Sequence, residues 1–170
     1  MKKILYVAIS IFILILIIIN ISIFHKKNCL KQMQSNYSFI INKKIEFAPL
    51  DSITQNANST QNHILTIVSP TCEDCYVKIN RWNTIVQRDK RFQNRVYFLV
   101  TGNEFERLNE LVKEKNNLKF IYDYENTFFK QNPNCLPSLT YLLGEKNNVI
   151  LCGMPLENKT TMNIFIDNLN

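Results

Sequence analysis

Glycine is scarce in this chain, with three residues in 170, and no glycine-rich loop of the kind that cradles phosphate groups is present. The sequence contains no internal repeat, and its low-complexity part is confined to the apolar N-terminus. Apart from one Cys-x-x-Cys, cysteine and histidine form no second tight pair. These absences disfavour nucleotide-binding and repeat proteins, and about 130 residues after the N-terminal segment suffice for one ordinary domain.

Positive charge is concentrated beside the apolar N-terminal run. Of the net charge of +6, Lys2, Lys3, Lys26 and Lys27 supply four, so residues 28–170 carry +2. A protein that binds nucleic acid presents a basic patch, and no cluster of Lys and Arg occurs in this part of the sequence. The sequence therefore predicts that nucleic acid is not a partner.

The N-terminal segment is long and apolar enough to cross a membrane. Residues 4–24 contain three clearly polar residues, and a helix of these 21 residues reaches about 32 Å, against a hydrocarbon core of about 30 Å. No small-x-small cleavage site follows, and Cys29 lacks the small apolar residues that precede a lipoprotein cysteine. An uncleaved anchor is therefore favoured over a signal peptide.

We accordingly predict a membrane anchor over residues 1–27, a polar tether over residues 28–37 and a single domain over residues 38–170. The lysine pairs on the two sides of the anchor are balanced, so the positive-inside bias is slight. We favour a cytoplasmic N-terminus with the domain outside the cytoplasm, on the periplasmic side.

Strand and helix patterns alternate along the predicted domain. Strands are expected over residues 64–68, 96–100 and 118–123, and helices over 76–86, 104–115 and 125–130. A hairpin follows at residues 139–143 and 149–152, and residues 160–169 form a last helix. Residues 38–50 suggest one or two leading strands that end at Pro49, and residues 51–62 a polar loop. The order predicts an α/β sandwich whose mixed central sheet is flanked by helices.

The motif Cys72-Glu73-Asp74-Cys75 lies at the junction between the first core strand and its helix. A sulfur at a helix N-terminus faces free N–H groups and the positive end of the dipole, which stabilise the reactive thiolate. Two intervening residues bring the second sulfur within bonding distance of the first. The motif is therefore interpreted as a reversible dithiol pair with Cys72 as nucleophile.

The residues between the cysteines are both acidic. The charges of Glu73 and Asp74 oppose formation of a thiolate and partly offset the helix dipole, so both are candidates for tuning the pKa of the pair. We expect a reducing pair, toward the thioredoxin end of a range of about −270 to −120 mV.

The spacing of the motif also fits two other roles. A zinc site needs two further ligands, and the remaining candidates are scattered: Cys29, Cys135, Cys152, His25 and His63. A permanent disulfide is possible, but so short a loop removes little entropy from the unfolded chain. We expect no metal and no other cofactor.

Residues 38–169 resemble the thioredoxin superfamily, and more closely its membrane-anchored TlpA-like branch, which includes disulfide reductases of cytochrome c maturation. The resemblance rests on the Cys72–Cys75 motif, on the strand and helix inserted between residues 105 and 130, and on Leu136-Pro137-Ser138 before the hairpin. It implies a thioredoxin-like three-layer sandwich. It also implies that Pro137 is cis and packs beside the motif, and that the backbone of Leu136 pairs with an extended substrate segment.

The sequence departs from the family pattern in several places. Ser69-Pro70-Thr71 stands where a Trp often precedes the first cysteine, and Thr66 stands where many thioredoxins have a buried Asp that moves protons for the second cysteine. Substitutes for this acid are Glu73, Asp74 or water. Cys135 could lie near the active pair or be a small buried hydrophobe, and a bridge from it to Cys152 stays open.

The leading functional hypothesis is a membrane-tethered thiol-disulfide oxidoreductase that reduces protein disulfides. Cys72 attacks a partner disulfide and Cys75 releases the reduced partner. Regeneration outside the cytoplasm implies a membrane-embedded electron donor. One alternative is a peroxiredoxin-like thiol peroxidase, although Leu65 and Ser69 replace the Pro and Thr of its Pro-x-x-x-Thr-x-x-Cys motif. The other is a non-enzymatic thioredoxin-like module that holds a partner or a metal ion.

Overall fold

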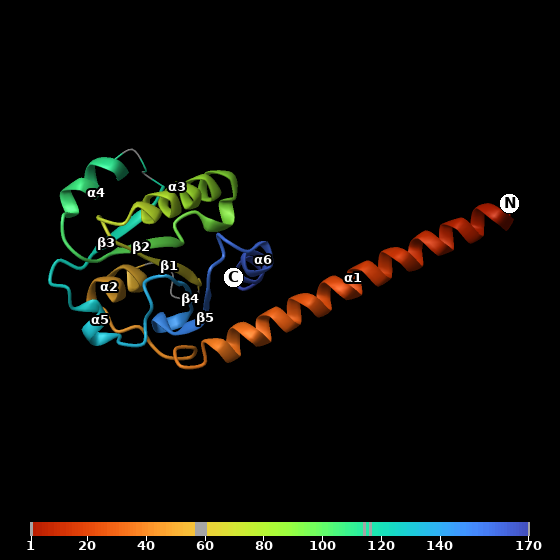
Figure 1. Ribbon diagram of the computed structural model, residues 1–170, viewed down its shortest axis with the longest axis horizontal. Coiled ribbons are helices and arrows are strands. Elements are labelled where there is room, and N and C mark those ends of the chain that lie inside the picture. The colour runs from red at the N-terminus through yellow and green to blue at the C-terminus, as the bar shows by residue number, and fades with distance from the viewer. Residues whose placement is uncertain (1, 57–60, 114, 116, 170) are drawn as a thin grey trace.

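A computed structural model describes residues 2–56, 61–113, 115 and 117–169. It contains a five-stranded sheet between two layers of helices, with a long N-terminal helix that projects from this body (Figure 1). The strands are β1 (His63–Val68), β2 (Val96–Val100), β3 (Lys119–Tyr122), β4 (Thr140–Leu143) and β5 (Val149–Gly153). The helices are α1 (Lys2–Asn36), α2 (Ala48–Asn56), α3 (Glu73–Arg88), α4 (Phe105–Val112), α5 (Phe128–Gln131) and α6 (Lys159–Asp167), with 3-10 turns at Lys90–Phe92 and Glu145–Asn147.

The sheet is mixed, in the order β3-β2-β1-β4-β5. Strands β1, β2 and β3 are parallel, whereas β4 is antiparallel to both of its neighbours, β1 and β5. Every residue of the central strand β1 is buried, as its continuous apolar run predicts. The predicted mixed sheet and hairpin are confirmed.

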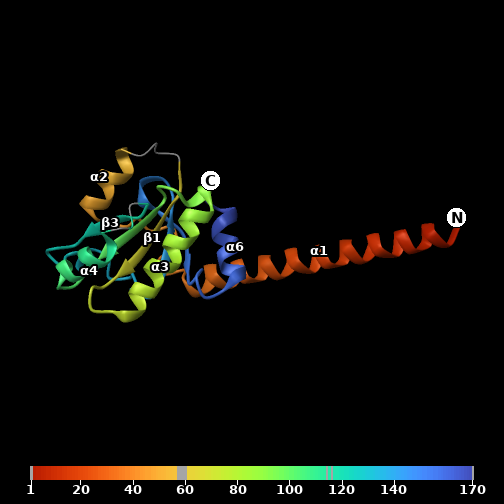
Figure 2. The same cartoon turned by 90° about the horizontal axis from the view of Figure 1, so that it is seen from above.

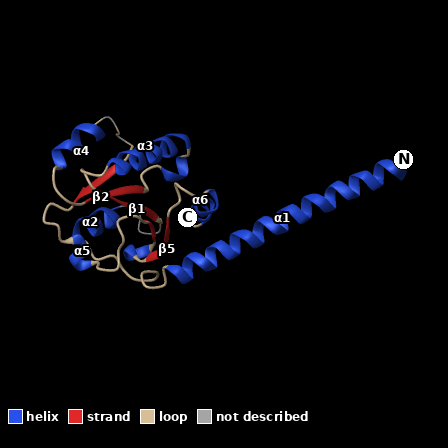
Figure 3. Ribbon diagram, in the orientation of Figure 1, coloured by secondary structure: helices blue, strands red, loops and turns tan. Residues whose placement is uncertain are grey.

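Helices cover both faces of the sheet (Figure 3). Ile64 and Val68 of β1 belong to the apolar cluster beneath α3, α4 and α6, and Leu65 and Ile67 belong to the cluster beneath α2 and α5. This alternation follows from the two-residue period of a strand. The three-layer α/β fold expected from the sequence is confirmed.

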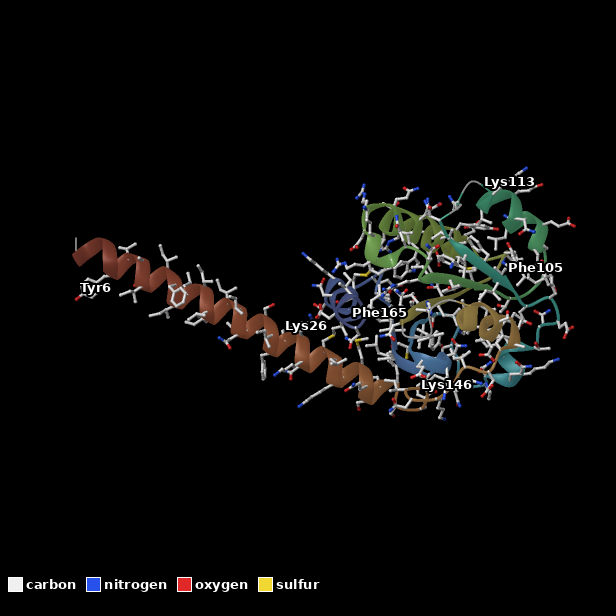
Figure 4. All side chains as sticks on the ribbon, turned by 180° about the vertical axis from the view of Figure 1, so that it is seen from behind. Tyr6, Lys26, Phe105, Lys113, Lys146 and Phe165 are labelled. Atoms are coloured by element: carbon white, nitrogen blue, oxygen red, sulfur yellow. A yellow bond between two sulfur atoms is a disulfide. The ribbon has the colours of Figure 1, made fainter. Side chains whose placement is uncertain are left out.

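Helix α1 is a candidate membrane span that continues into the domain. An 18-residue window within Tyr6–Asn36 has a mean hydropathy of 3.0, and none of it is buried. Figure 2 shows the helix projecting from the body, and Figure 4 shows Tyr6 at its far end and Lys26 where it approaches α6. A single span by length and composition is consistent with the predicted anchor.

Residues 28–36 are helical, where a polar tether was predicted. Met33 is buried, and its Cε lies 3.0 Å from the position that a Cβ on Gly153 would occupy. Cys29 and Leu30 also pack against the core, and Lys26 forms an ion pair with Asp167 of α6. Because these apolar residues recur at helical spacing, they give an otherwise polar segment one face that the domain can bury.

The predicted leading strands over residues 38–50 are wrong. Residues 37–42 form turns, Lys44 makes an isolated bridge with Asn148, and α2 begins at Ala48. Pro49 lies in the first turn of α2, where a missing N–H costs nothing. The predicted loop over residues 51–62 is helical up to Asn56, and residues 57–60 lie outside the described part. Helices α4 and α5 are shorter than predicted.

Candidate functional site

Cys72 is the N-cap of α3, so its side chain faces the free N–H groups of the first turn. Its backbone is extended, with φ −97° and ψ 111°, and its Sγ accepts a hydrogen bond from the N–H of Cys75 over 3.2 Å. A capping sulfur in this position receives both the hydrogen bond and the field of the helix dipole. Both favour the thiolate of Cys72 over the thiol.

Cys72 and Cys75 form a disulfide, with their Cα atoms 5.3 Å apart. Cys72 is half-buried, whereas Cys75 is 6% exposed. The Sγ of Cys75 also accepts a hydrogen bond of 3.5 Å from the N–H of Ser69. An incoming molecule can therefore reach Cys72 more readily than Cys75, which is the asymmetry that an attacking and a resolving cysteine need.

The turn between β1 and α3 is fixed on two sides. Pro70 is buried, and its carbonyl accepts a hydrogen bond from the hydroxyl of Tyr76. On the other side Gly102 has a φ of +106°, and a Cβ there would lie 3.3 Å from the Oγ of Ser69. The Tyr76 hydrogen bond holds the turn that brings Cys72 to the start of the helix, and Gly102 lets a second chain segment approach Ser69 closely.

Glu73 and Asp74 are exposed in the first turn of α3. Neither forms an ion pair within the described residues. Their charges complement the positive end of the helix dipole and repel a thiolate at the same place, as the sequence suggests.

Three segments distant in sequence meet at the carboxyl end of β1. Because β4 is antiparallel to β1, Thr140 at its start pairs with Thr66, and Gly153 at the end of β5 pairs with Thr140. The residues before β4 and after β5 are thereby brought beside Cys72. They form a groove of about 610 Å³ that the structure lines with Ile67, Val68, Ser69, Cys72, Asp74, Cys75, Val77, Lys78, Arg81, Thr101, Pro137, Ser138, Met154 and Glu157.

Pro137 is exposed and shares this groove with both cysteines, but its peptide bond is not cis. The expected cis Leu136–Pro137 bond is therefore corrected to trans, the isomer that an X-Pro bond prefers by about 0.5–1 kcal/mol. The segment closes as a turn, in which Leu139 N–H donates to the carbonyl of Leu136 over 3.1 Å.

The backbone of Leu136 is occupied by a tyrosine hydroxyl. Leu136 N–H donates to Tyr141 Oη over 2.6 Å, and the same hydroxyl donates to the Leu136 carbonyl over 2.9 Å. Pairing of this backbone with a substrate strand would have to displace Tyr141. The side chain of Leu136 is 41% exposed and needs no such displacement to touch a partner.

A pair of threonines lies where the resemblance implies a buried acid. Thr66 is 1% exposed, and its hydroxyl lies 3.3 Å from the hydroxyl of Thr140 across the sheet. The two hydroxyls satisfy each other, so neither is left as a buried polar group without a partner.

Cys135 and Cys152 are free thiols on the other face of the sheet. Both belong to the apolar cluster under α2 and α5, whereas Cys75 belongs to the cluster under α3. Burial raises the pKa of Cys135 to about 11 and that of Cys152 to about 12. Of the two alternatives left open by the sequence, Cys135 is the small buried hydrophobe, and no bridge joins it to Cys152.

The sequence did not predict which residues of α3 line the groove. Asp74, Val77, Lys78 and Arg81 recur at intervals of three and four residues, which places them on one helix face. That spacing is visible in the sequence, but Met154 and Glu157 on the opposite wall are not predictable from local patterns. Among the described residues, no three His, Cys, Asp or Glu side chains gather as a metal site.

Comparisons with known proteins find similarity in structure. No protein-family model matches the chain, and no curated protein matches its sequence. A protein assigned as the thiol:disulfide interchange protein DsbE from Chlorobium tepidum superposes with a TM-score of 0.55 and 11% identity, over 68% of this chain and 85% of that one. The thioredoxin domain of a thiol-disulfide oxidoreductase from Bacteroides vulgatus gives 0.50 and 12%, over 68% and 84%. A thioredoxin-like protein from Aeropyrum pernix gives 0.51 and 9%, over 66% and 80%. The domain therefore has a thioredoxin-like fold.

Proposed function

We propose that the chain is a membrane-tethered thiol-disulfide oxidoreductase that reduces disulfides in a protein partner. The observation that carries the proposal is the Cys72–Cys75 disulfide at the N-terminus of α3, with a sulfur that caps the helix at one end of a groove. The thioredoxin-like fold supports the same chemistry. Dithiol exchange needs no metal, flavin or nucleotide.

In the reduced protein, the thiolate of Cys72 attacks one sulfur of the partner disulfide. The bond between the partner sulfurs breaks, a Cys72–partner disulfide forms, and the leaving sulfur takes a proton from water. Cys75 then loses its proton and attacks Cys72 Sγ, which releases the second partner thiol and leaves the Cys72–Cys75 disulfide. Two electrons pass from the protein to its partner.

Pro137 and Leu136 are proposed to meet the substrate, and Glu73 and Asp74 to tune the pair. Pro137 lines the groove beside both sulfurs, and the exposed side chain of Leu136 precedes it. Because the Leu136 backbone is bonded to Tyr141, we assign substrate contact to the Leu136 side chain. The acidic residues disfavour the thiolate and so favour transfer of electrons out of the pair.

We further propose that the domain lies outside the cytoplasm, with the N-terminus inside. A cycle that ends with a disulfide there needs a dithiol that supplies two electrons, and a donor embedded in the same membrane meets this requirement. A membrane-impermeant thiol reagent on intact, reduced cells should label Cys72. Labelling that appears only after the cells are permeabilised would place the domain in the cytoplasm.

The test of the activity uses the full-length protein in detergent. Cys75→Ser keeps the attacking sulfur but removes the resolving one, so it should accumulate a mixed disulfide with a disulfide-bonded protein such as insulin. Cys72→Ser should accumulate far less at the motif, because Cys75 is buried, and Cys29→Ser in the background of both variants removes the remaining half-exposed thiol. With dithiothreitol as the electron donor, turnover of insulin by the unmodified protein above the rate of dithiothreitol alone, lost in both variants, supports the proposal, and absence of any such turnover overturns it.

A further inference from the structure

The groove beside Cys72 is lined by an acidic side chain and then two basic ones along α3. Asp74 lies within the motif, whereas Lys78 and Arg81 lie about one and two turns further along the same face of α3. Glu157 on the opposite wall is the remaining charged residue of the lining. None of these four side chains forms an ion pair within the part of the chain that the structure describes.

The groove also exposes apolar surface. Val77 on α3 is 56% exposed and Met154 on the opposite wall is 42% exposed, and Leu136 lies just before Pro137 with 41% exposed. Outside α1, the large hydrophobic residues exposed elsewhere on the described surface are Phe39 and Tyr124. Apolar side chains gathered around one groove mark a surface that a partner covers.

The length of the groove suits a short piece of extended chain. Cys72 and Arg81 are nine residues apart, which corresponds to about 13–14 Å along a helix axis. An extended polypeptide covers this distance with about four residues.

We propose that the groove binds an extended substrate segment with an apolar residue next to its cysteine and an acidic residue about four positions away. Lys78 and Arg81 then act as specificity-determining residues, which pair with the acidic side chain, while Val77 and Met154 contact the apolar one. This inference rests on the proposed function and names the class of segment that the oxidoreductase accepts. Unpaired charges at a rim select partners by complementarity.

The test uses the full-length, reduced protein in detergent and short peptides whose one cysteine is bonded to 2-thiopyridine. Reduction converts the enzyme dithiol to its disulfide and releases the peptide thiol and 2-thiopyridone, whose absorbance over this single turnover gives a second-order rate constant that corresponds to kcat/KM. Peptides carry Asp or Lys four positions before or after the cysteine. The Asp peptide should be preferred by about fivefold at low salt in one of the two orientations, since two exposed ion pairs replace two repulsions.

Charge reversal identifies the residues responsible. The double variant Lys78→Glu/Arg81→Glu should invert the preference, and 0.5 M NaCl should abolish it in the unmodified protein, because the screening length falls to about 4 Å. Arg88→Glu is the control, since it reverses one charge on α3 outside the groove lining and should leave the preference intact. Met154→Ser should lower kcat/KM for peptides with an apolar neighbour without altering the charge preference.

The outcomes separate this inference from the function on which it rests. If no peptide is reduced, the proposed oxidoreductase function fails. If all peptides are reduced at equal rates, or Arg88→Glu alters the preference as strongly as the double reversal, only the groove assignment fails. A glutathione–thiopyridine disulfide that is reduced faster than every peptide, and slowed by the double reversal, would assign the groove to glutathione and overturn the proposal.

Discussion

Two pairs of cysteines lie on opposite faces of the sheet, and their environments differ. Cys72 and Cys75 are joined at the start of α3, where a sulfur accepts a backbone hydrogen bond and a groove gives access. Cys135 and Cys152 are separate thiols, 4% and 0% exposed, and burial raises the pKa of each. We therefore expect that position relative to a helix N-terminus and to solvent, rather than residue type, decides which sulfurs react.

Tyr141 connects the two regions. Its side chain is buried on the same face as Cys135 and Cys152, and it is the partner of Cys152 in the register of β4 and β5. Its hydroxyl accepts a hydrogen bond from the N–H of Leu136 and donates one to its carbonyl, next to the groove residue Pro137. The buried thiols thus lie behind one wall of the reactive groove.

Alkylation should give the largest contrast between the pairs. With a pKa of about 11, the thiolate of Cys135 is about 10⁻⁴ of the total at pH 7, and the thiol is shielded as well. In the reduced, folded protein we expect iodoacetamide to modify Cys72 at least about 10³ times faster than Cys135 or Cys152. Mass spectrometry of timed samples measures this, and in urea the three rates should converge. Comparable rates in the folded protein would contradict the comparison.

The two pairs of cysteines should also differ in their contribution to the rate of disulfide reduction. Cys72→Ala should lower the rate of disulfide reduction by about 10³ or more, because the attacking atom is lost. Cys135→Ala/Cys152→Ala removes two thiols that do not line the groove and should keep the rate within about threefold. A measurement of unfolding by urea on each variant shows whether the protein is folded. A folded double variant without activity would assign the buried thiols a redox role.

The sequence alone predicts the elements that hold Cys72 and Cys75, because these elements depend on local patterns. A continuous apolar run predicts β1, an apolar stripe predicts α3, and the motif between them predicts the reactive pair. The sequence does not predict helix α2, because the residues before Ala48 alternate weakly like a strand, and Pro49 is typical of the end of a strand as well as of the first turn of a helix.

The remaining features depend on contacts between distant segments. The groove needs α3, the loop before β4 and the loop after β5 together. Met33 is buried beside Gly153, where a Cβ would lie 3.0 Å from Met33 Cε. No periodicity within one segment reports such pairings.

High pH should lower the free energy of unfolding through the buried thiols of Cys135 and Cys152. The Cys72–Cys75 disulfide has no thiol proton to lose and should not contribute. The unfolded thiols lose their protons near pH 9, whereas the folded ones keep them up to about pH 11 for Cys135 and about pH 12 for Cys152. Between these values the unfolded chain binds fewer protons, so the free energy of unfolding should fall with rising pH, by about 3 kcal/mol for Cys135 alone. Urea unfolding at pH 8, 9, 10 and 11 measures the slope. Cys135→Ala/Cys152→Ala should reduce the slope, and an identical slope would contradict the burial argument.

Removing one hydroxyl should test the link between the two regions. Tyr141→Phe deletes both hydrogen bonds to Leu136, so the free energy of unfolding should fall by about 1–2 kcal/mol. Tyr97→Phe is the control, because that buried hydroxyl accepts one long bond of 3.4 Å from Lys119. Alkylation of Cys72 should keep its rate in both variants. If Tyr141→Phe alters the reactivity of Cys72, the two regions are coupled more tightly than their separation by the sheet implies.

The smallest effect concerns the charges inside the motif. Glu73→Gln/Asp74→Asn removes two exposed carboxylates beside the sulfur of Cys72, so its thiolate should become about two- to fivefold more favourable at low salt, and less so at 0.5 M NaCl. Because a more stable thiolate stabilises the reduced form, the equilibrium constant with glutathione should show a more oxidising pair, and alkylation of Cys72 should persist to lower pH. Glu104→Gln/Glu106→Gln makes the same change at the start of α4 and should leave both unchanged. A motif variant that is more reducing than the unmodified protein would mean that the acidic residues act on the disulfide form, and would reverse the role assigned to them.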